Sequence, residues 1–109
     1  MTGFRVLIID AQRDQRRRLR SLLAQLEAPL QVVDMPSGEE ALLEYSRQKV
    51  DLVISGLRLP GMSGMELMER LRLRTPQQKI ILITGKEASH PLELIRKAGA
   101  EAVLQKPFA

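Results

Sequence analysis

The chain has no cysteine and no tryptophan, and only three aromatic residues occur among its 109 positions: Phe4, Tyr45 and Phe108. The lack of cysteine excludes disulfides, thiolate metal sites and a cysteine nucleophile. With so few aromatic rings, the core must be built from Leu, Ile, Val and Met. No apolar run approaches the ~20 residues of a membrane-spanning helix, and residues 1–5 do not resemble a signal peptide. We therefore expect a cytoplasmic protein with no membrane partner.

Positive charge exceeds negative charge modestly, with 17 basic and 13 acidic residues and a formal net charge of +4. Much of the excess lies in one short segment, which contains Arg13, Arg16, Arg17, Arg18 and Arg20. Two interpretations stay open. The segment is a solvated helix face, or Arg13, Arg16, Arg17 and Arg20 form a candidate interaction surface for an acidic protein partner. Nucleic acid is not the expected partner, because the chain shows no nucleic-acid recognition motif beside this charge.

Apolar patterning predicts strands that alternate with helices along the whole chain. Short β-branched runs predict strands over residues 4–9, 31–33, 52–55, 79–84 and 102–104. Helical spacing predicts helices over residues 12–26, 39–48, 65–74 and a fourth that begins near 89–91 and ends at 99. Such alternation is typical of a doubly wound, five-stranded parallel sheet with helices on both faces, here in one domain over residues 1–109.

Helix ends carry their own signals. Asp14 is a candidate cap for the first helix, because its short carboxylate can accept hydrogen bonds from backbone N–H groups. Ser37 followed by Glu40 resembles a capping box that opens the second helix. Gly99 suits a helix end in a left-handed conformation.

Five segments in order resemble the receiver domains of bacterial response regulators. They are Val6-Leu7-Ile8-Ile9-Asp10, Ser37-Gly38-Glu39-Glu40-Ala41-Leu42, Leu57-Arg58-Leu59-Pro60-Gly61-Met62-Ser63-Gly64, Ile83-Thr84-Gly85 and Leu104-Gln105-Lys106-Pro107-Phe108. Each is weak alone, but together they cover nearly the whole chain with natural spacing. The resemblance implies the flavodoxin-like α/β fold of that family.

The resemblance also implies a site that two acidic residues, a phosphoacceptor aspartate, a Thr or Ser and a Lys would form. Asp10 matches the first acidic residue, and Thr84 and Lys106 match the hydroxyl and the ammonium group. Ala11 stands in place of the second acidic residue, and Gly56 stands in place of the phosphoacceptor. Glycine offers no carboxylate to attack phosphorus. Magnesium, which is usually held by carboxylates and substrate phosphate, would keep only Asp10. We therefore expect a degenerate, pseudo-receiver site with no metal and no cofactor.

Two functions follow from this resemblance. The first is a phosphorylation-independent protein-interaction module in bacterial two-component signal transduction, which is not an enzyme. The alternative is a regulatory domain that senses a small anion or a nucleotide through Thr84 and Lys106. Ser55 and Ser63 are weak substitutes for the acceptor, because the single histidine, His90, is not expected near them.

The resemblance further implies a fifth helix, which would follow Phe108, whereas this sequence stops at Ala109. We expect apolar surface to be exposed where that helix would pack. A longer parent chain, a partner subunit or a homodimer with exchanged segments could each cover it.

Overall fold

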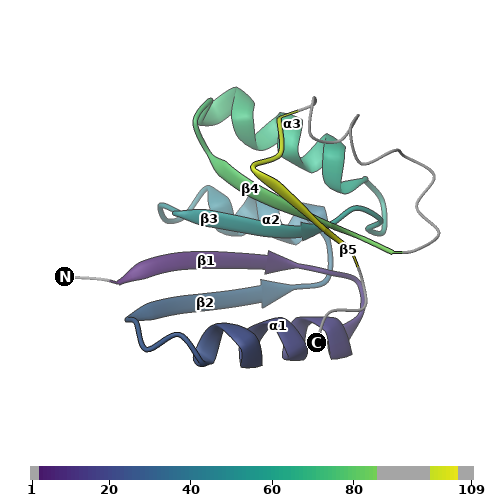
Figure 1. Cartoon of the computed structure of the whole chain (residues 1–109). Coiled ribbons are helices and arrows are strands. Elements are labelled where there is room, and N and C mark those ends of the chain that lie inside the picture. Colours follow the sequence, from purple (N-terminus) through teal and green to yellow (C-terminus); the bar gives the residue numbers. More distant parts are fainter. Residues whose placement is uncertain (1–2, 86–98, 106–109) are drawn as a thin grey trace.

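The computed structural model describes residues 3–85 and 99–105 of the chain, which form a parallel sheet with helices on both faces (Figure 1). The strands are β1 (Phe4–Ile9), β2 (Leu30–Met35), β3 (Leu52–Gly56), β4 (Lys79–Thr84) and β5 (Ala102–Gln105). The helices of the described residues are α1 (Arg13–Ala24), α2 (Gly38–Tyr45) and α3 (Gly64–Arg74). The predicted parallel α/β fold is confirmed. The helix expected between residues 89 and 99 lies outside the described residues.

The strand order is β2-β1-β3-β4-β5, and every neighbouring pair is parallel. The chain moves outward from β1 to β2 and then crosses back to β3 on the other side of β1. Ligands of open α/β sheets bind where the strand order reverses in this way, at the carboxyl ends of the strands. The register pairs Ile9 with Ser55 and Gly56 with Ile83, so the residues that end β1, β3 and β4 lie along one edge.

Strand β1 is buried on both faces, as its continuous apolar run predicted. Leu7 and Ile9 point into the core beneath α2 and α3, where they join Leu67 and Leu71 of α3. The side chains of the opposite face include Val6, Ile8, Ile54 and Ile83. There the one buried residue that α1 contributes is Leu19. The face under α1 therefore has less helical cover, among the described residues, than the face under α2 and α3.

The start of α1 differs from its prediction. The N-cap is Gln12, its side chain makes no capping hydrogen bond, and Asp14 lies inside the first turn. The prediction that Asp14 caps the helix is therefore wrong. The carboxylate of Asp10 holds this corner instead, because its Oδ1 accepts a hydrogen bond from the N–H of Gln12 at 2.8 Å. The helix also ends at Ala24, before Leu26, which is 56% exposed in the following turn.

Two serines cap helices. Ser37 caps α2, as predicted, and its Oγ accepts a hydrogen bond from the N–H of Glu40. This helix ends at Tyr45 and not at Gln48, so the predicted length is too great. Ser63 caps α3 in the same way, because its Oγ accepts from the N–H of Glu66 at 3.1 Å.

Ser63→Ala is expected to lower the free energy of unfolding by about 1 kcal/mol, since it removes the hydrogen bond to a backbone N–H that has no partner within the helix. Urea unfolding followed by circular dichroism measures this change. The matched control is Ser21→Ala, an exposed position inside α1, where alanine has the better helix propensity and no loss is expected. Equal losses in the two variants would contradict the capping role of Ser63.

Candidate functional site

The candidate site lies at the carboxyl ends of β1, β3 and β4. Asp10 follows β1 directly, Gly56 ends β3 and Thr84 ends β4. Asp10 and Thr84 are each 2% exposed, and Gly56 is also buried. The parallel register brings these three positions together, although Thr84 lies 74 positions after Asp10 in the sequence (84 − 10).

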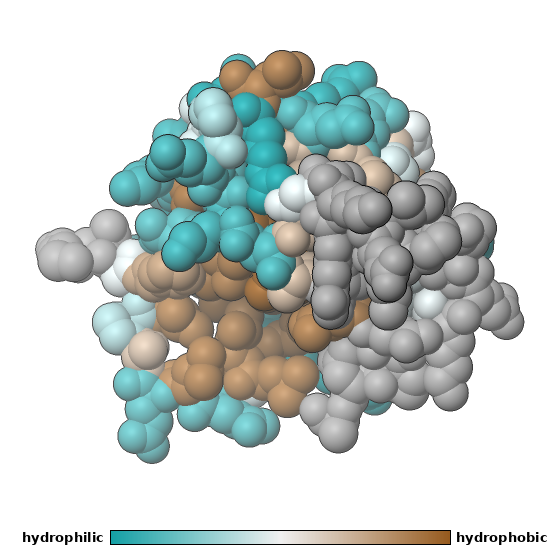
Figure 2. Space-filling view, turned by 45° about the horizontal axis from the view of Figure 1, so that its top comes forward, coloured by the Kyte–Doolittle hydropathy of each residue, from teal (hydrophilic) through white to brown (hydrophobic). Residues whose placement is uncertain are grey.

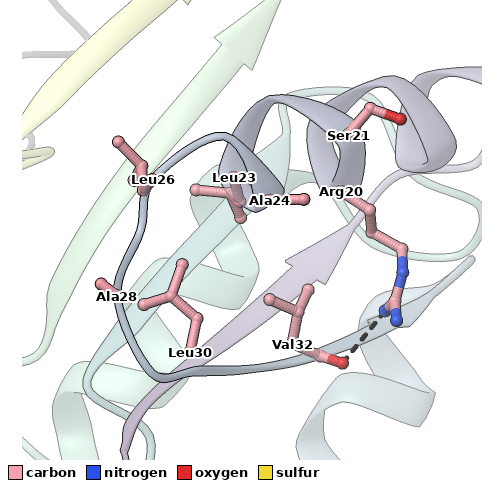
Figure 3. Close-up of a pocket in the computed structure, with 8 residues that line it drawn as sticks. All are labelled: Arg20, Ser21, Leu23, Ala24, Leu26, Ala28, Leu30 and Val32. Atoms are coloured by element: carbon pink, nitrogen blue, oxygen red, sulfur yellow. Dashed lines mark hydrogen bonds between the residues drawn. The ribbon is translucent and has the colours of Figure 1, made fainter.

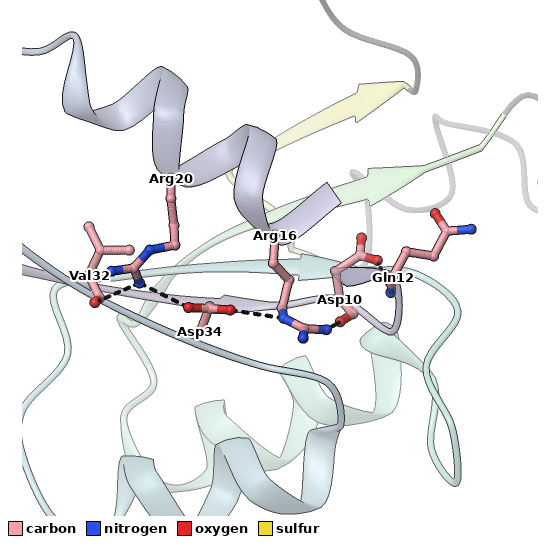
Figure 4. A network of polar contacts seen from close by, with 6 residues as sticks. All are labelled: Asp10, Gln12, Arg16, Arg20, Val32 and Asp34. Atoms are coloured by element: carbon pink, nitrogen blue, oxygen red, sulfur yellow. Dashed lines mark hydrogen bonds and ion pairs between the residues drawn. The ribbon is translucent and has the colours of Figure 1, made fainter. Parts of the chain in front are cut away.

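Asp10 is held tightly by its own loop. Its Oδ1 accepts from the N–H of Gln12, and its backbone carbonyl accepts from a terminal nitrogen of Arg16 at 2.7 Å (Figure 4). Its Oδ2 lies beside Gly56, because a Cβ added at Gly56 would stand 3.2 Å from that oxygen. The carboxylate is thus part of the folded corner as well as a candidate ligand.

Gly56 lies close to Asp10 and Leu59. The atoms nearest to an added Cβ are Asp10 Oδ2 at 3.2 Å and Leu59 Cδ2 at 3.6 Å. A real Cβ at 3.2 Å would require the neighbouring carboxylate to shift by a few tenths of an ångström. The backbone does not need glycine here, since its φ is not positive. A side chain at this position would therefore pack closely against Asp10 and Leu59.

The residues present do not fit a magnesium ion. Mg²⁺ prefers six oxygen ligands in near-octahedral geometry and is usually bound by carboxylates together with substrate oxygens. Asp10 is the one carboxylate among the site positions of the described chain, since Ala11 and Gly56 have none to offer. Residues 3–85 and 99–105 contain no group of three or more His, Cys, Asp or Glu side chains placed to hold a metal ion.

Thr84 turns its hydroxyl toward its own chain, where it donates to the carbonyl of Gly85 at 3.3 Å. Lys106 lies outside the described residues, as does His90. The structure therefore brings Asp10, Gly56 and Thr84 together. The anion site that Thr84 and Lys106 would form stays a prediction.

The arginine-rich segment divides into two groups of side chains. In the first group, Asp34 on β2 binds two of the arginines. Arg16 Nε lies 2.9 Å from its Oδ2, and Arg20 Nη1 lies 2.9 Å from its Oδ1 (Figure 4). The side chain of Arg16 is only 14% exposed, and it also binds the carbonyl of Asp10. The guanidinium of Arg16 therefore joins α1 to β2 and to the residue that follows β1, and its place in a docking surface stays a prediction.

The other arginines of that segment face solvent. Arg13 and Arg17 are exposed and form no ion pair with any residue of the described chain, and Arg20 keeps 46% of its side chain exposed. These three remain candidates for an interaction surface. One signal in the sequence for Asp34 was not used: an acidic residue between Val33 and Met35 of a strand can indicate an ion pair with a neighbouring helix.

Comparison with known proteins identifies the family. Residues 6–109 match the response regulator receiver domain. The chain belongs to this family. It is 34% identical over 105 residues to a response regulator receiver protein of Anaeromyxobacter sp. strain Fw109-5. The matched region covers 96% of this chain and 43% of that protein. It is 36% identical over 111 residues to the cyclic di-GMP phosphodiesterase response regulator RpfG of Xanthomonas campestris pv. campestris, which covers 97% of the chain and 29% of that protein.

Solved structures show the same fold. The response regulator TrrA of Thermotoga maritima, crystallised with Mg²⁺ and BeF, superposes with a TM-score of 0.81 at 31% identity and covers 96% of this chain and 88% of that one. A signal receiver domain of an HD domain-containing protein from Pseudomonas fluorescens Pf-5 gives a TM-score of 0.83 at 31% identity, over 97% and 84% of the two chains. The flavodoxin-like receiver fold implied by the sequence is confirmed.

The receiver domain spans less than half of the length of the curated relatives named above, 43% and 29%. None of the helices in the described part of the chain is long and apolar enough to cross a membrane.

Neither serine near the site of this receiver domain is placed as a substitute nucleophile. Ser55 is 1% exposed, and its hydroxyl donates to the carbonyl of Gly56 at 2.9 Å. Ser63 is exposed and caps α3 through its Oγ. Both hydroxyls therefore have structural partners, and no histidine base lies beside them in the described residues.

Proposed function

We propose that this receiver domain is a protein-interaction module whose activity does not depend on phosphorylation. The observation that carries the proposal is Gly56, a buried residue without a side chain at the end of β3, where the family resemblance places the phosphoacceptor. A phosphoryl acceptor must present a nucleophilic oxygen, and Gly56 presents none.

The surroundings of Gly56 support the same conclusion. Phosphoryl transfer depends on positioning and on charge neutralisation, largely by a metal ion. Ala11 and Gly56 remove two of the expected carboxylates, and Asp10 Oδ1 is bound to the N–H of Gln12. With neither a nucleophile nor a set of metal ligands, the domain is proposed to be a non-enzymatic scaffold. The fold remains able to present surfaces to other proteins, because its core does not require the lost groups.

The proposal is tested first by adding Mg²⁺ to the ¹⁵N-labelled chain. We expect no saturable shift of the amide resonances of Asp10, Gly56 and Thr84 up to millimolar Mg²⁺, with or without beryllofluoride. The positive control is the T. maritima TrrA, whose structure was determined with Mg²⁺ and BeF. An occupied site would also raise stability, by about 2.7 kcal/mol at a ligand concentration of 100 times the Kd. Saturable shifts at these three residues, with one ion bound per chain, would contradict the proposal.

A further inference from the structure

A groove separates the second half of α1 from the start of β2, on the face of the sheet that α1 covers. Its volume is about 420 Å³, and Figure 3 shows the side chains around it. It is lined by Arg20, Ser21, Leu23, Ala24, Leu26, Ala28, Leu30 and Val32. Most of this lining is aliphatic, and the polar groups, Arg20 and Ser21, belong to the helix wall.

Apolar surface remains open to solvent in and beside this groove. Leu26 is 56% exposed, and Leu23, Leu30 and Val32 are only partly buried against the core beneath α1. The space-filling view shows apolar side chains gathered in a broad area of the face that it displays (Figure 2). Contiguous apolar surface that is bordered by polar residues is typical of a docking site.

The helix wall of the groove is positively charged. Arg13, Arg17, Arg20 and Ala24 are spaced by four, three and four residues, so they follow one stripe of α1 that leads into the groove. Arg16 and Arg20 share the single carboxylate of Asp34, which leaves one positive charge in that cluster. Arg13 and Arg17 have no ion-pair partner in the described residues. A partner with acidic side chains beside its apolar ones would match this wall.

The edge strand favours a helical partner over an extended one. An added β-strand would need the free backbone groups of β2. The carbonyl of Val32 is already bound by Arg20 Nη1 at 3.0 Å, and the same guanidinium is fixed by Asp34 (Figure 3, Figure 4). An amphipathic helix needs no backbone hydrogen bonds from its receptor, since its own are satisfied internally.

We propose that this groove binds an amphipathic helix of a partner protein, with leucine-like side chains against Leu23, Leu26 and Leu30 and acidic side chains along Arg17 and Arg20. The proposal rests on the interaction-module function above, and it gives the partner's surface chemistry. The acidic partner expected from the arginine-rich segment is thus assigned to one face of α1 and to the groove at its end.

The probe is a synthetic peptide of about 16 residues, since isolated helices shorter than ~12–15 residues are marginal in water. It carries leucines at helical spacing and glutamates elsewhere, and a twin peptide has lysines in place of the glutamates. Binding is followed by NMR with the ¹⁵N-labelled chain at low salt. We expect the acidic peptide to shift the amide resonances of Leu23, Leu26 and Val32 saturably, and the basic twin to bind at least tenfold more weakly.

Exposed positions provide matched variants that leave the fold intact. Leu26→Ser is expected to weaken the acidic peptide roughly tenfold, because it removes apolar contact, whereas Leu73→Ser on α3, at a site 84% exposed, leaves binding unchanged. Arg17→Glu is expected to weaken it roughly three- to tenfold, whereas Arg74→Glu, also exposed and on α3, does not.

Three results would overturn the groove proposal. They are equal binding of the two peptides, shifts confined to other surfaces, or no binding by either peptide. Concentration-dependent shifts of Leu23, Leu26 and Val32 without peptide, together with dimerisation in sedimentation, would show a second copy as the occupant and would also overturn it. None of these results bears on phosphorylation. A phosphoryl adduct, in contrast, would remove the proposed function and leave the groove result standing.

Discussion

Gly64→Ala is expected to lower the free energy of unfolding by about 3 kcal/mol, at the upper end of the usual cost of overpacking a tight contact. A Cβ at Gly64 would stand 2.2 Å from the carbonyl oxygen of Gly56 and 3.1 Å from the Cα of Leu57. Both neighbours are backbone, so no side chain can rotate to make room. The N–H of Gly64 also donates to the carbonyl of Leu57 at 2.8 Å. The N–H of Leu57 in turn donates to the carbonyl of Ile83 at 2.7 Å.

The contact at Gly64 fixes the loop that follows β3, and with it the position of Gly56. The matched control is Gly85→Ala, because an added Cβ at Gly85 would meet no atom of residues 3–85 and 99–105 within 4 Å. Its φ is not positive, so alanine fits the backbone and is expected to be neutral or to stabilise by up to ~1 kcal/mol through the unfolded state. Urea unfolding of both variants measures the difference. A Gly64→Ala variant as stable as Gly85→Ala would contradict the described approach of α3 to β3.

Gly56→Asp is expected to destabilise the domain by roughly 2 kcal/mol without Mg²⁺, within the common range for single substitutions at buried sites. The new Cβ would lie 3.2 Å from Asp10 Oδ2, so a second carboxylate would be placed beside a residue that is only 2% exposed. Two like charges at such short range oppose each other strongly where water is excluded. The loss in the Gly56→Asp variant is therefore mainly electrostatic.

The control for Gly56→Asp is Gly56→Asn, which has nearly the same shape and no charge. We expect the asparagine variant to lose less stability and not to respond to Mg²⁺. The Ala11→Asp, Gly56→Asp double variant, in contrast, offers three carboxylates with Asp10 and is expected to recover stability as Mg²⁺ is added. Thermal unfolding with and without Mg²⁺ measures both effects. Equal losses for aspartate and asparagine would show that packing, and not charge, excludes a carboxylate at this position.

The fold could be predicted because its signals are local. The apolar run of β1 and the helical spacing of Leu67, Met68 and Leu71 require no knowledge of distant residues. The structure buries these three helix side chains and residues 6–9 of the strand, whereas Phe4 at its start is 47% exposed. Helix ends were harder to predict. Aspartate is a common N-cap residue, so Asp14 was predicted to cap α1. The helix begins earlier, at Arg13, because Asp10 in the preceding turn accepts a hydrogen bond from the N–H of Gln12.

Contacts between distant residues could not be predicted from spacing. Arg16 was interpreted as a surface residue because its segment is strongly basic. Asp34, which binds it, lies 18 residues away on a strand whose register was unknown. The groove beside Leu26 was missed for a similar reason, since the sequence placed Leu26 inside the helix. A parallel sheet by itself places Asp10, Gly56 and Thr84 at the carboxyl ends of its strands. The close approach of Gly64 to the backbone of Gly56 could be found only from the three-dimensional structure.

The measurement that tests the central claim most directly is the intact mass of the full chain after incubation with acetyl phosphate and Mg²⁺. T. maritima TrrA is treated in parallel to show that the reagent is active. If Gly56 leaves the domain without an acceptor, the mass of the chain stays unchanged at every time point. A stoichiometric gain of one phosphoryl group on a side chain of the candidate site, lost again at alkaline pH as an acyl phosphate would be, would contradict the proposal.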